Sequence, residues 1–421
     1  MLKLVLRSAG AKLVTLPVSA VCGLLVTGIY IHSAGVEGFA AISIVATIFL
    51  LIPFADLGMG VGVVNVFAST EEGSARRPAV VISALRVLLP VAGVIMLVAI
   101  AGATIFSWTR VLGIDESLIG NMDVVTAAAL ALFGAALPMG LGQRVLLGVN
   151  KNHLAVILNS LASVVTLGVA ATMAGLGIDP RWFATSPVAG LVVASLLGSA
   201  FASRFVRLEL RQLFDVRHVA ERGLVSSGAW MMLISGGSAV VFHAGRMILG
   251  HASNAVEVAQ YSLAMQFFVP INGLMLAAGF ALWPLLARHP DERRRAIVLR
   301  FQVGFLVAGL TIGVVLIALG GPFGRVISGG EIDLDRTLLV SFAALITVQF
   351  AQIVPGMSLM SPSGLVFQGL VSIPCTLAFV VSAWFLRESI TAWMVALLAA
   401  VMILLFQLVP TSIRVYRAPR G

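Results

Sequence analysis

Basic side chains inside apolar runs are the residues of this sequence best suited to chemistry. Arg86 lies about seven residues into one such run, roughly 10 Å along a helix at ~1.5 Å per residue. A charge near the bilayer centre costs at least ~2.5–3.5 kcal/mol, so it marks a candidate site. A guanidinium carries permanent charge and several donors, which suits it to phosphate groups. Arg86 is therefore a candidate anion ligand, unless it reaches the headgroups or pairs with Asp56.

Four further basic residues are candidates of the same kind. His243 and Arg246 are three residues apart, on one face of a helix near its outer end. They could receive an anion, or His243 could titrate during transport; an interfacial arginine beside a satisfied histidine is the structural alternative. Arg144 and Arg300 fall at cytoplasmic helix ends, where they could anchor the helices or form the rim that admits an anionic headgroup.

A second group of residues has coupling or mechanical roles to test. Asp56, with Asn65 nine residues on, could bind a proton or sodium ion, or could be structural. Prolines inside spans remove a backbone hydrogen bond and bend the helix, which predicts hinges. The predicted hinge residues are Pro53, Pro138, Pro270 and Pro355.

Composition places these residues in a membrane protein. Of 421 residues, 59% are hydrophobic and 11% are charged, against ~25% charged in soluble domains. The net charge of +9 is expected from basic cytoplasmic loops, so no nucleic-acid partner is predicted. The histidines and two cysteines show no metal-ligand spacing, and we expect neither a metal site, a cofactor nor an enzyme.

Apolar runs of spanning length predict an all-α integral membrane fold with about twelve transmembrane helices. The predicted spans are 13–32, 39–67, 79–107, 122–147, 154–176, 184–203, 224–249, 259–287, 296–320, 337–360, 364–386 and 390–413. With the N-terminus inside, 20 of the 27 Lys and Arg residues are cytoplasmic and six are on the opposite side, with Arg86 in a span. This bias predicts that both termini are cytoplasmic.

The chain also divides into two halves. Residues 1–203 form the predicted N-terminal lobe, 204–223 a basic amphipathic linker on the inner leaflet, and 224–421 the C-terminal lobe. Pro53 and Pro138 recur as Pro270 and Pro355, each 217 residues later, as do paired arginines at 76–77 and 293–294. Six spans separate equivalent helices, so the six-helix lobes form a parallel repeat with a pseudo-twofold axis along the membrane normal. This arrangement favours a carrier that works by alternating access.

Three short motifs resemble a known family. They are GVEGFA at 35–40, ADLGMG at 55–60 followed by Asn65, and VEVAQY at 256–261. Their turns and span layout resemble bacterial polysaccharide and O-antigen flippases of the multidrug/oligosaccharidyl-lipid/polysaccharide exporter (MOP) superfamily.

The resemblance implies movement of an undecaprenyl-pyrophosphate-linked oligosaccharide across the bacterial inner membrane during lipopolysaccharide or other cell-surface polysaccharide biosynthesis. It implies contacts with membrane lipid, a proton or sodium gradient or product consumption as the energy source, and polysaccharide polymerases or glycosyltransferases as candidate partners. The sequence lacks a Gly-rich phosphate loop ending in Gly-Lys-Ser/Thr, which speaks against direct use of ATP.

Other functions predict different sequence features. A multidrug-type antiporter for cations would require an acidic cavity, whereas Arg86 and Arg246 outnumber Asp56 at membrane depth. A major-facilitator carrier would have a Gly-Asp-Arg-Gly-Arg type loop, which residues 70–77 do not match. A membrane polymerase or ligase would usually need longer periplasmic loops than 108–121 and 321–336.

Substitution of Arg86 tests its predicted anion-binding role. We expect Arg86→Ala to abolish glycan export while the protein still inserts, and Arg86→Lys to retain part of it because it keeps the charge. Surface polysaccharide and membrane-inserted protein are measured in cells that express only the variant. Normal polysaccharide with Arg86→Ala would exclude this role.

Overall fold

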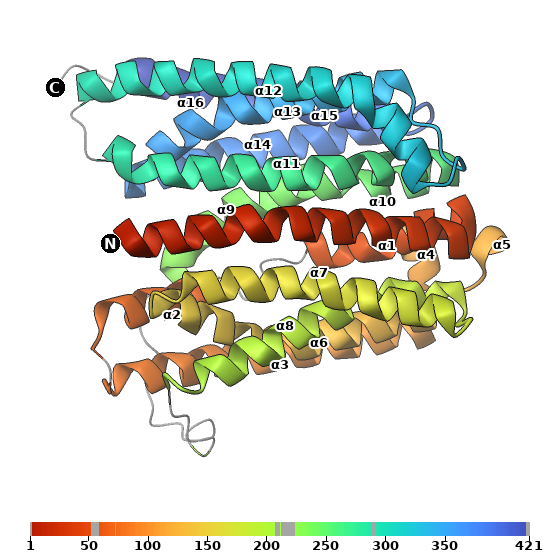
Figure 1. The fold of residues 1–421 in the computed structure, drawn as a ribbon, viewed down its shortest axis with the longest axis horizontal. Helices are drawn as coiled ribbons and strands as arrows, with labels where there is room; N and C mark the ends of the chain where they lie inside the picture. The colour runs from red at the N-terminus through yellow and green to blue at the C-terminus, as the bar shows by residue number, and fades with distance from the viewer. Residues whose placement is uncertain are drawn as a thin grey trace. The chain divides into compact units, whose positions relative to one another are not determined.

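The computed structural model describes residues 2–51, 59–71, 73–206, 211, 224–287 and 291–417, and these are helical with short connections (Figure 1). An all-helical fold is expected in lipid, because helices satisfy their own backbone hydrogen bonds there. Ten described helices are long and apolar enough to span a membrane, or eleven if one bent pair is a single span. The chain is thus a multi-pass membrane protein, and the predicted fold class is confirmed.

The first helix, α1 (Leu2–Leu51), contains the first predicted span and the beginning of the second. The two parts meet at Gly35, whose φ of 70° is a left-handed conformation that only glycine adopts without strain. Because α1 counts as one candidate span where the sequence predicts two, the structure has fewer spans than the predicted twelve. Residues 52–58, with Pro53 and Asp56, lie outside the described residues, so the predicted kink at Pro53 stays a prediction.

The chain separates into two units, 1–34 with 48–232 and 35–47 with 233–421. Segment 35–47 thus groups with the second unit, although the sequence analysis placed it in the first lobe. Most of the predicted linker, 207–210 and 212–223, lies outside the described residues, so its amphipathic structure stays a prediction. We refer to the units below as the N-unit and the C-unit.

The N-unit has α6 (Asp123–Gly148) at its centre, packed against α8 (Ser186–Ala202), α3 (Arg76–Thr104) and α2 (Met59–Ser69). On the far side of α8 lies α7 (Asn152–Gly175) (Figure 1). A Cβ on Gly142 would lie 2.4 Å from the backbone nitrogen of Ser199, so this glycine lets α6 and α8 meet closely. Such small-residue contacts are how helices associate in lipid.

The remaining elements of the N-unit are short. A predicted loop after α3 contains α4 (Trp108–Leu112) and α5 (Glu116–Ile119), two helical turns that the sequence analysis did not predict. Asp123, at the start of α6, accepts hydrogen bonds from the backbone N–H and the hydroxyl of Thr109, both at 2.7 Å, and so ties this loop down. The 3₁₀ helix η1 (Pro180–Thr185) leads into α8.

The C-unit has α13 (Arg336–Ser358) at its centre, the most buried of the candidate spans. Around it pack α11 (Ala255–Ala287), α12 (Asp291–Ile327) and α15 (Ala392–Ile403), with α14 (Pro362–Phe385) beside α15 (Figure 1). The last span continues through a π-helical turn, η3 (Leu404–Leu408), into α16 (Val409–Arg417). The predicted seventh span is α9 (Leu224–His243) and α10 (Gly245–Ala252), whose described parts are bent by 43°.

One boundary in the C-unit was predicted wrongly. The loop 321–336 begins only after Ile327, because α12 continues through Gly320, Gly321 and Pro322. The span was predicted to end at residue 320, but glycine and proline are tolerated inside membrane helices. Gly320 packs closely against Leu339 of α13 at this point. In the shortened loop, Asp333 accepts two hydrogen bonds from Arg325, which lower the pKa of this carboxyl group.

The internal repeat is visible in a matching hydrogen bond. His32 Nδ1 bonds to the carbonyl oxygen of Gly28 at 2.9 Å, and His251 Nδ1 bonds to that of Met247 at 2.8 Å. Each histidine therefore caps the helix turn that precedes the second span of its half. In the second half, Asn254 then accepts from the backbone N–H of Glu257 and starts α11.

A glycine substitution in α12 tests the central packing of the C-unit. A Cβ on Gly313 would lie 3.0 Å from the Cβ of Ala343, so Gly313→Leu must push α12 away from α13. We expect a loss of about 1–3 kcal/mol in stability. The control, Gly304→Leu, lies on the same helix, where an added Cβ meets nothing within 4 Å. Thermal unfolding of the purified proteins in detergent measures both; equal melting temperatures would contradict this packing role.

Candidate functional site

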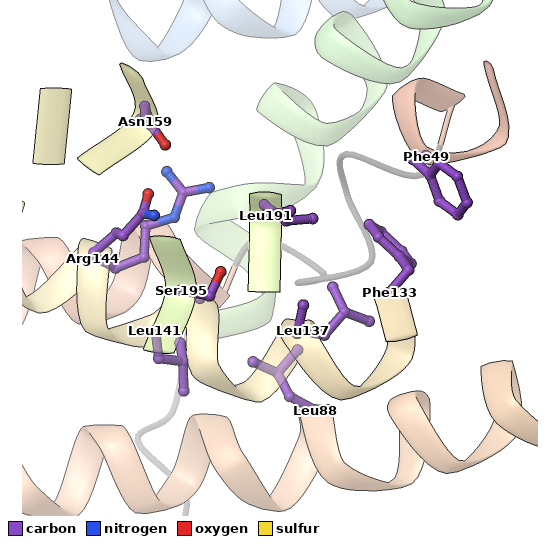
Figure 2. A pocket seen from close by; sticks show the side chains of 12 residues that line it. Phe49, Leu88, Phe133, Leu137, Leu141, Arg144, Asn159, Leu191 and Ser195 are labelled. Atoms are coloured by element: carbon purple, nitrogen blue, oxygen red, sulfur yellow. The ribbon is translucent and has the colours of Figure 1, made fainter. Parts of the chain in front are cut away.

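A cavity of about 350 Å³ lies inside the N-unit and has one polar and one apolar end (Figure 2). We name it the N-unit pocket. Its polar end contains Gln143, Arg144, Asn159 and Ser195, and Figure 2 shows Arg144 and Asn159 together at that end. Its apolar end contains Phe49 and Phe133, whose ring centroids are 5.5 Å apart. The pocket is therefore amphiphilic.

Close packing of α6 and α8 positions the polar end. A Cβ on Gly198 would lie 2.9 Å from the Cγ of Gln143, so the side chain of Gln143 lies directly against α8. Gln143 and Arg144 are neighbours on α6, one turn before that helix ends. Ser195, on α8, is only 2% exposed, whereas Arg144 and Asn159 are exposed. The guanidinium is the one charged group among the residues that line the pocket.

A second cluster of candidate residues lies in the C-unit. Arg246, at the start of α10, is 6% exposed, and its Nη1 donates to the hydroxyl of Thr47 at a long distance of 3.4 Å. Thr47 donates in turn to the carbonyl oxygen of Ser43, so its hydroxyl has lone pairs left to accept. Arg246 Nε and His243 Nδ1 are both buried without a hydrogen-bond partner. We name these residues the Arg246 cluster.

The Arg246 cluster is unusual because buried charges are normally paired. Among the described residues, no carboxylate forms an ion pair with Arg246. Gly245 lies against Tyr261, since a Cβ there would be 2.6 Å from the phenolic oxygen, so aromatic surface packs beside this turn. The cluster can therefore offer hydrogen-bond donors to an anion.

The other predicted site residues lie apart from these two. Arg86 is half-buried on α3 and is not among the residues that line the N-unit pocket, although Leu88 is. Arg300 is exposed on α12, and Asn65 is exposed on α2. Asp56 falls outside the described residues.

Three predicted hinge prolines are described. Pro138 lines a second, largely apolar cavity of about 530 Å³ between α3, α6 and α8. Pro355 is buried at the end of α13, and Pro270 is half-buried in α11. Pro53 falls outside the described residues, and movement at any of these prolines stays a prediction.

Sequence reasoning missed residues whose role depends on tertiary contacts. Phe49 was not singled out because it is one apolar residue within a long apolar run. Thr47 and Ser195 are small hydroxyl residues of the kind that often join helices, and nothing in their local sequence marks them. Gln143 and Asn159 are polar residues within predicted spans, but nothing in the sequence indicates that they lie close together.

Comparison with known proteins identifies related sequences and folds. The model of a family described as polysaccharide biosynthesis protein matches residues 5–289. No curated protein sequence matches the chain.

Solved structures with the same fold include transporters of two kinds. An inward-facing multidrug resistance MATE family transporter of the MOP superfamily aligns with a TM-score of 0.70 at 16% identity, covering 94% of this chain and 95% of that chain. The lipid II flippase MurJ, in an inward closed conformation, aligns with a TM-score of 0.65 at 12% identity, covering 98% and 87%. A MOP superfamily transporter from Pyrococcus furiosus, whose description refers to a reverse polarity of its binding pocket, aligns with a TM-score of 0.59 at 15% identity. The alignment covers 98% of this chain and 96% of that chain. At these identities the likeness shows the fold alone.

Replacement of Arg246 tests whether this buried charge serves stability or function. We expect Arg246→Met to stabilise the protein by about 1–4 kcal/mol, because an apolar side chain of similar length avoids the desolvation of a poorly paired cation. We expect the same variant to lose transport. Thermal unfolding and an export assay are compared with those of Arg325→Met, an exposed arginine in the same unit. A lower melting temperature for Arg246→Met would instead make the charge structural.

Proposed function

Because the chain belongs to the polysaccharide biosynthesis protein family, we propose that it is a flippase for an undecaprenyl-pyrophosphate-linked oligosaccharide. The match over residues 5–289 is the observation that carries this proposal. The flippase lies in the bacterial inner membrane with both termini in the cytoplasm, as the charge bias predicts. It supplies the assembly of O-antigen or another surface polysaccharide.

The chemistry of the two candidate sites supports an anionic substrate. A pyrophosphate requires permanent positive charge and several donors. Arg144 in the N-unit pocket and Arg246 in the C-unit each supply a guanidinium, and the amides of Gln143 and Asn159 add donors beside Arg144. Arg86 and Arg300 remain candidates for the path of the headgroup, and His243 for its reception or for proton coupling. The chain acts as a carrier rather than as an enzyme.

The movement itself follows from the internal repeat. Two units that repeat one plan favour a carrier that works by alternating access, opening first to one side of the membrane and then to the other. The prolines at 138, 270 and 355 lie in helices that such a motion would bend. Asp56 and Asn65 are candidates to couple it to a proton or sodium ion, and polymerases or glycosyltransferases would work beside it.

A multidrug-type antiporter is the second candidate function, because MATE transporters share the fold. A site for cationic drugs would need acidic side chains. Among the residues that line the N-unit pocket there is no carboxylate, and its charged group is Arg144. The glycan carrier therefore fits this pocket better.

Depletion of the protein in its own bacterium tests the proposal. We expect lipid-linked oligosaccharide to accumulate in the inner leaflet, where a glycosidase added to intact spheroplasts does not reach it, and surface polysaccharide to fall. Re-expression of the wild-type chain should reverse both effects. Normal polysaccharide without accumulation would refute the flippase. Loss of resistance to cationic dyes in the same cells would point to the antiporter.

A further inference from the structure

The N-unit pocket is polar at one end and apolar at the other, and this division follows the direction of α6. Arg144 lies four residues before the end of that helix, and Phe133 lies eleven residues before Arg144. At ~1.5 Å per residue, the phenylalanine is roughly 17 Å further along the span. In the orientation that the charge bias predicts, the polar end lies at the cytoplasmic headgroups and the apolar end lies deeper in the hydrocarbon.

The polar end has the donors that a phosphate group requires. Arg144 is exposed, and Asn159 lies at the same end of the pocket (Figure 2). The amide of Gln143 also lines the pocket. Arginine binds phosphate through several parallel hydrogen bonds, which neutral amides then supplement. Ser195 adds a hydroxyl at the inner boundary of this polar end.

The apolar end is built from rigid side chains. Phe49 and Phe133 are in ring contact, and Leu137 and Leu191 pack with them against a buried cluster that includes Ala129. The side chains of these residues offer an apolar surface that is continuous with the polar end and has no hydrogen-bonding groups. Such a surface suits a hydrocarbon chain and excludes sugar hydroxyls, whose desolvation would go uncompensated.

The size of the pocket limits what it can hold. Its volume of about 350 Å³ is near the lower end of ligand sites, which span ~300–1,000 Å³. This volume suits a phosphate headgroup with a short length of chain, and it is too small for an oligosaccharide as well.

We propose that the N-unit pocket binds the diphosphate and the first isoprene units of a prenyl diphosphate lipid from the cytoplasmic leaflet, with Arg144 on the diphosphate and Phe49 and Phe133 on the prenyl chain. The inference rests on the proposed flippase function and adds to it. The protein recognises the lipid carrier at both sides of the phosphate–hydrocarbon junction, and the glycan lies outside this pocket. Recognition of the carrier rather than the sugar would let one pocket serve glycans of different structure.

Binding to the purified full-length protein in nanodiscs tests this assignment. The probes are farnesyl diphosphate, inorganic pyrophosphate and farnesol, each titrated by calorimetry. We expect farnesyl diphosphate to bind more tightly than either fragment. Arg144→Gln should weaken it by about tenfold or more, as expected for loss of a charge-assisted hydrogen bond. Phe49→Ser should weaken the binding of farnesyl diphosphate but not the binding of pyrophosphate.

The matched control is Lys151→Gln, an exposed cation three residues beyond the end of α6 that does not line the pocket. We expect it to bind farnesyl diphosphate like the wild type. Equal losses in Lys151→Gln and Arg144→Gln would overturn the proposal, because they would show diffuse attraction by the basic surface. Equal competition by phosphatidic acid would also overturn it, because the pocket would then accept ordinary phospholipids.

Failure of this inference can be told apart from failure of the flippase function. If depletion causes lipid-linked oligosaccharide to accumulate and Arg144→Gln binds farnesyl diphosphate normally, the flippase stands and the pocket assignment fails. If binding follows the expected pattern but depletion leaves surface polysaccharide unchanged, the pocket assignment stands as a lipid site and the flippase function fails.

Discussion

Close helix contact at glycines is the constraint on which both units depend. In lipid, apolar side chains gain little by leaving the hydrocarbon tails, so helices associate through packing and hydrogen bonds rather than through the hydrophobic effect. A Cβ on Gly142 would be 2.4 Å from a backbone atom of α8, and one on Gly313 would be 3.0 Å from α13. These contacts hold the central helices α6 and α13 among their neighbours. Gln143 and Ser195 of the N-unit pocket lie on α6 and α8, which are placed in this way.

Tight packing also determines where charge can be placed. Arg144 lies one turn before the end of α6, at the polar end of a pocket, where its guanidinium remains exposed. Arg246 is 6% exposed in the packed C-unit, with Thr47 as its hydrogen-bond acceptor. The first arrangement leaves the guanidinium exposed among the amides that line the N-unit pocket. The second retains desolvated donors, which costs stability unless an anion reaches them.

The two halves resemble each other more in their central helices than in their basic residues. Central helices α6 and α13 each contain a proline, and the two are 217 residues apart. At the same offset, the position equivalent to Arg144 is Ser361; at the offset of 219 that pairs His32 with His251, the position equivalent to Arg246 is Thr27. The two units therefore share a packing plan and differ in their basic residues.

The sequence by itself determined the class of fold and the approximate spans, because a bilayer of fixed thickness demands long apolar helices and leaves few other solutions. The internal repeat could also be predicted from the sequence, because prolines and paired arginines recur at a constant separation of 217 residues. The end of α12 was misjudged, because the helix continues through Pro322 to Ile327, with Gly320 packed closely against Leu339 of α13.

The candidate sites were only partly readable from the sequence. Arg144 and Arg246 stood out because a charge in an apolar run is conspicuous. The residues that surround them did not stand out. Phe49 contacts Phe133, and Thr47 contacts Arg246, which is 199 residues away in the sequence, only once the helices have packed. The sequence thus determined which side chains can bind an anion, while the tertiary structure decided what surrounds them, since contacts between distant helices depend on packing and not on local spacing.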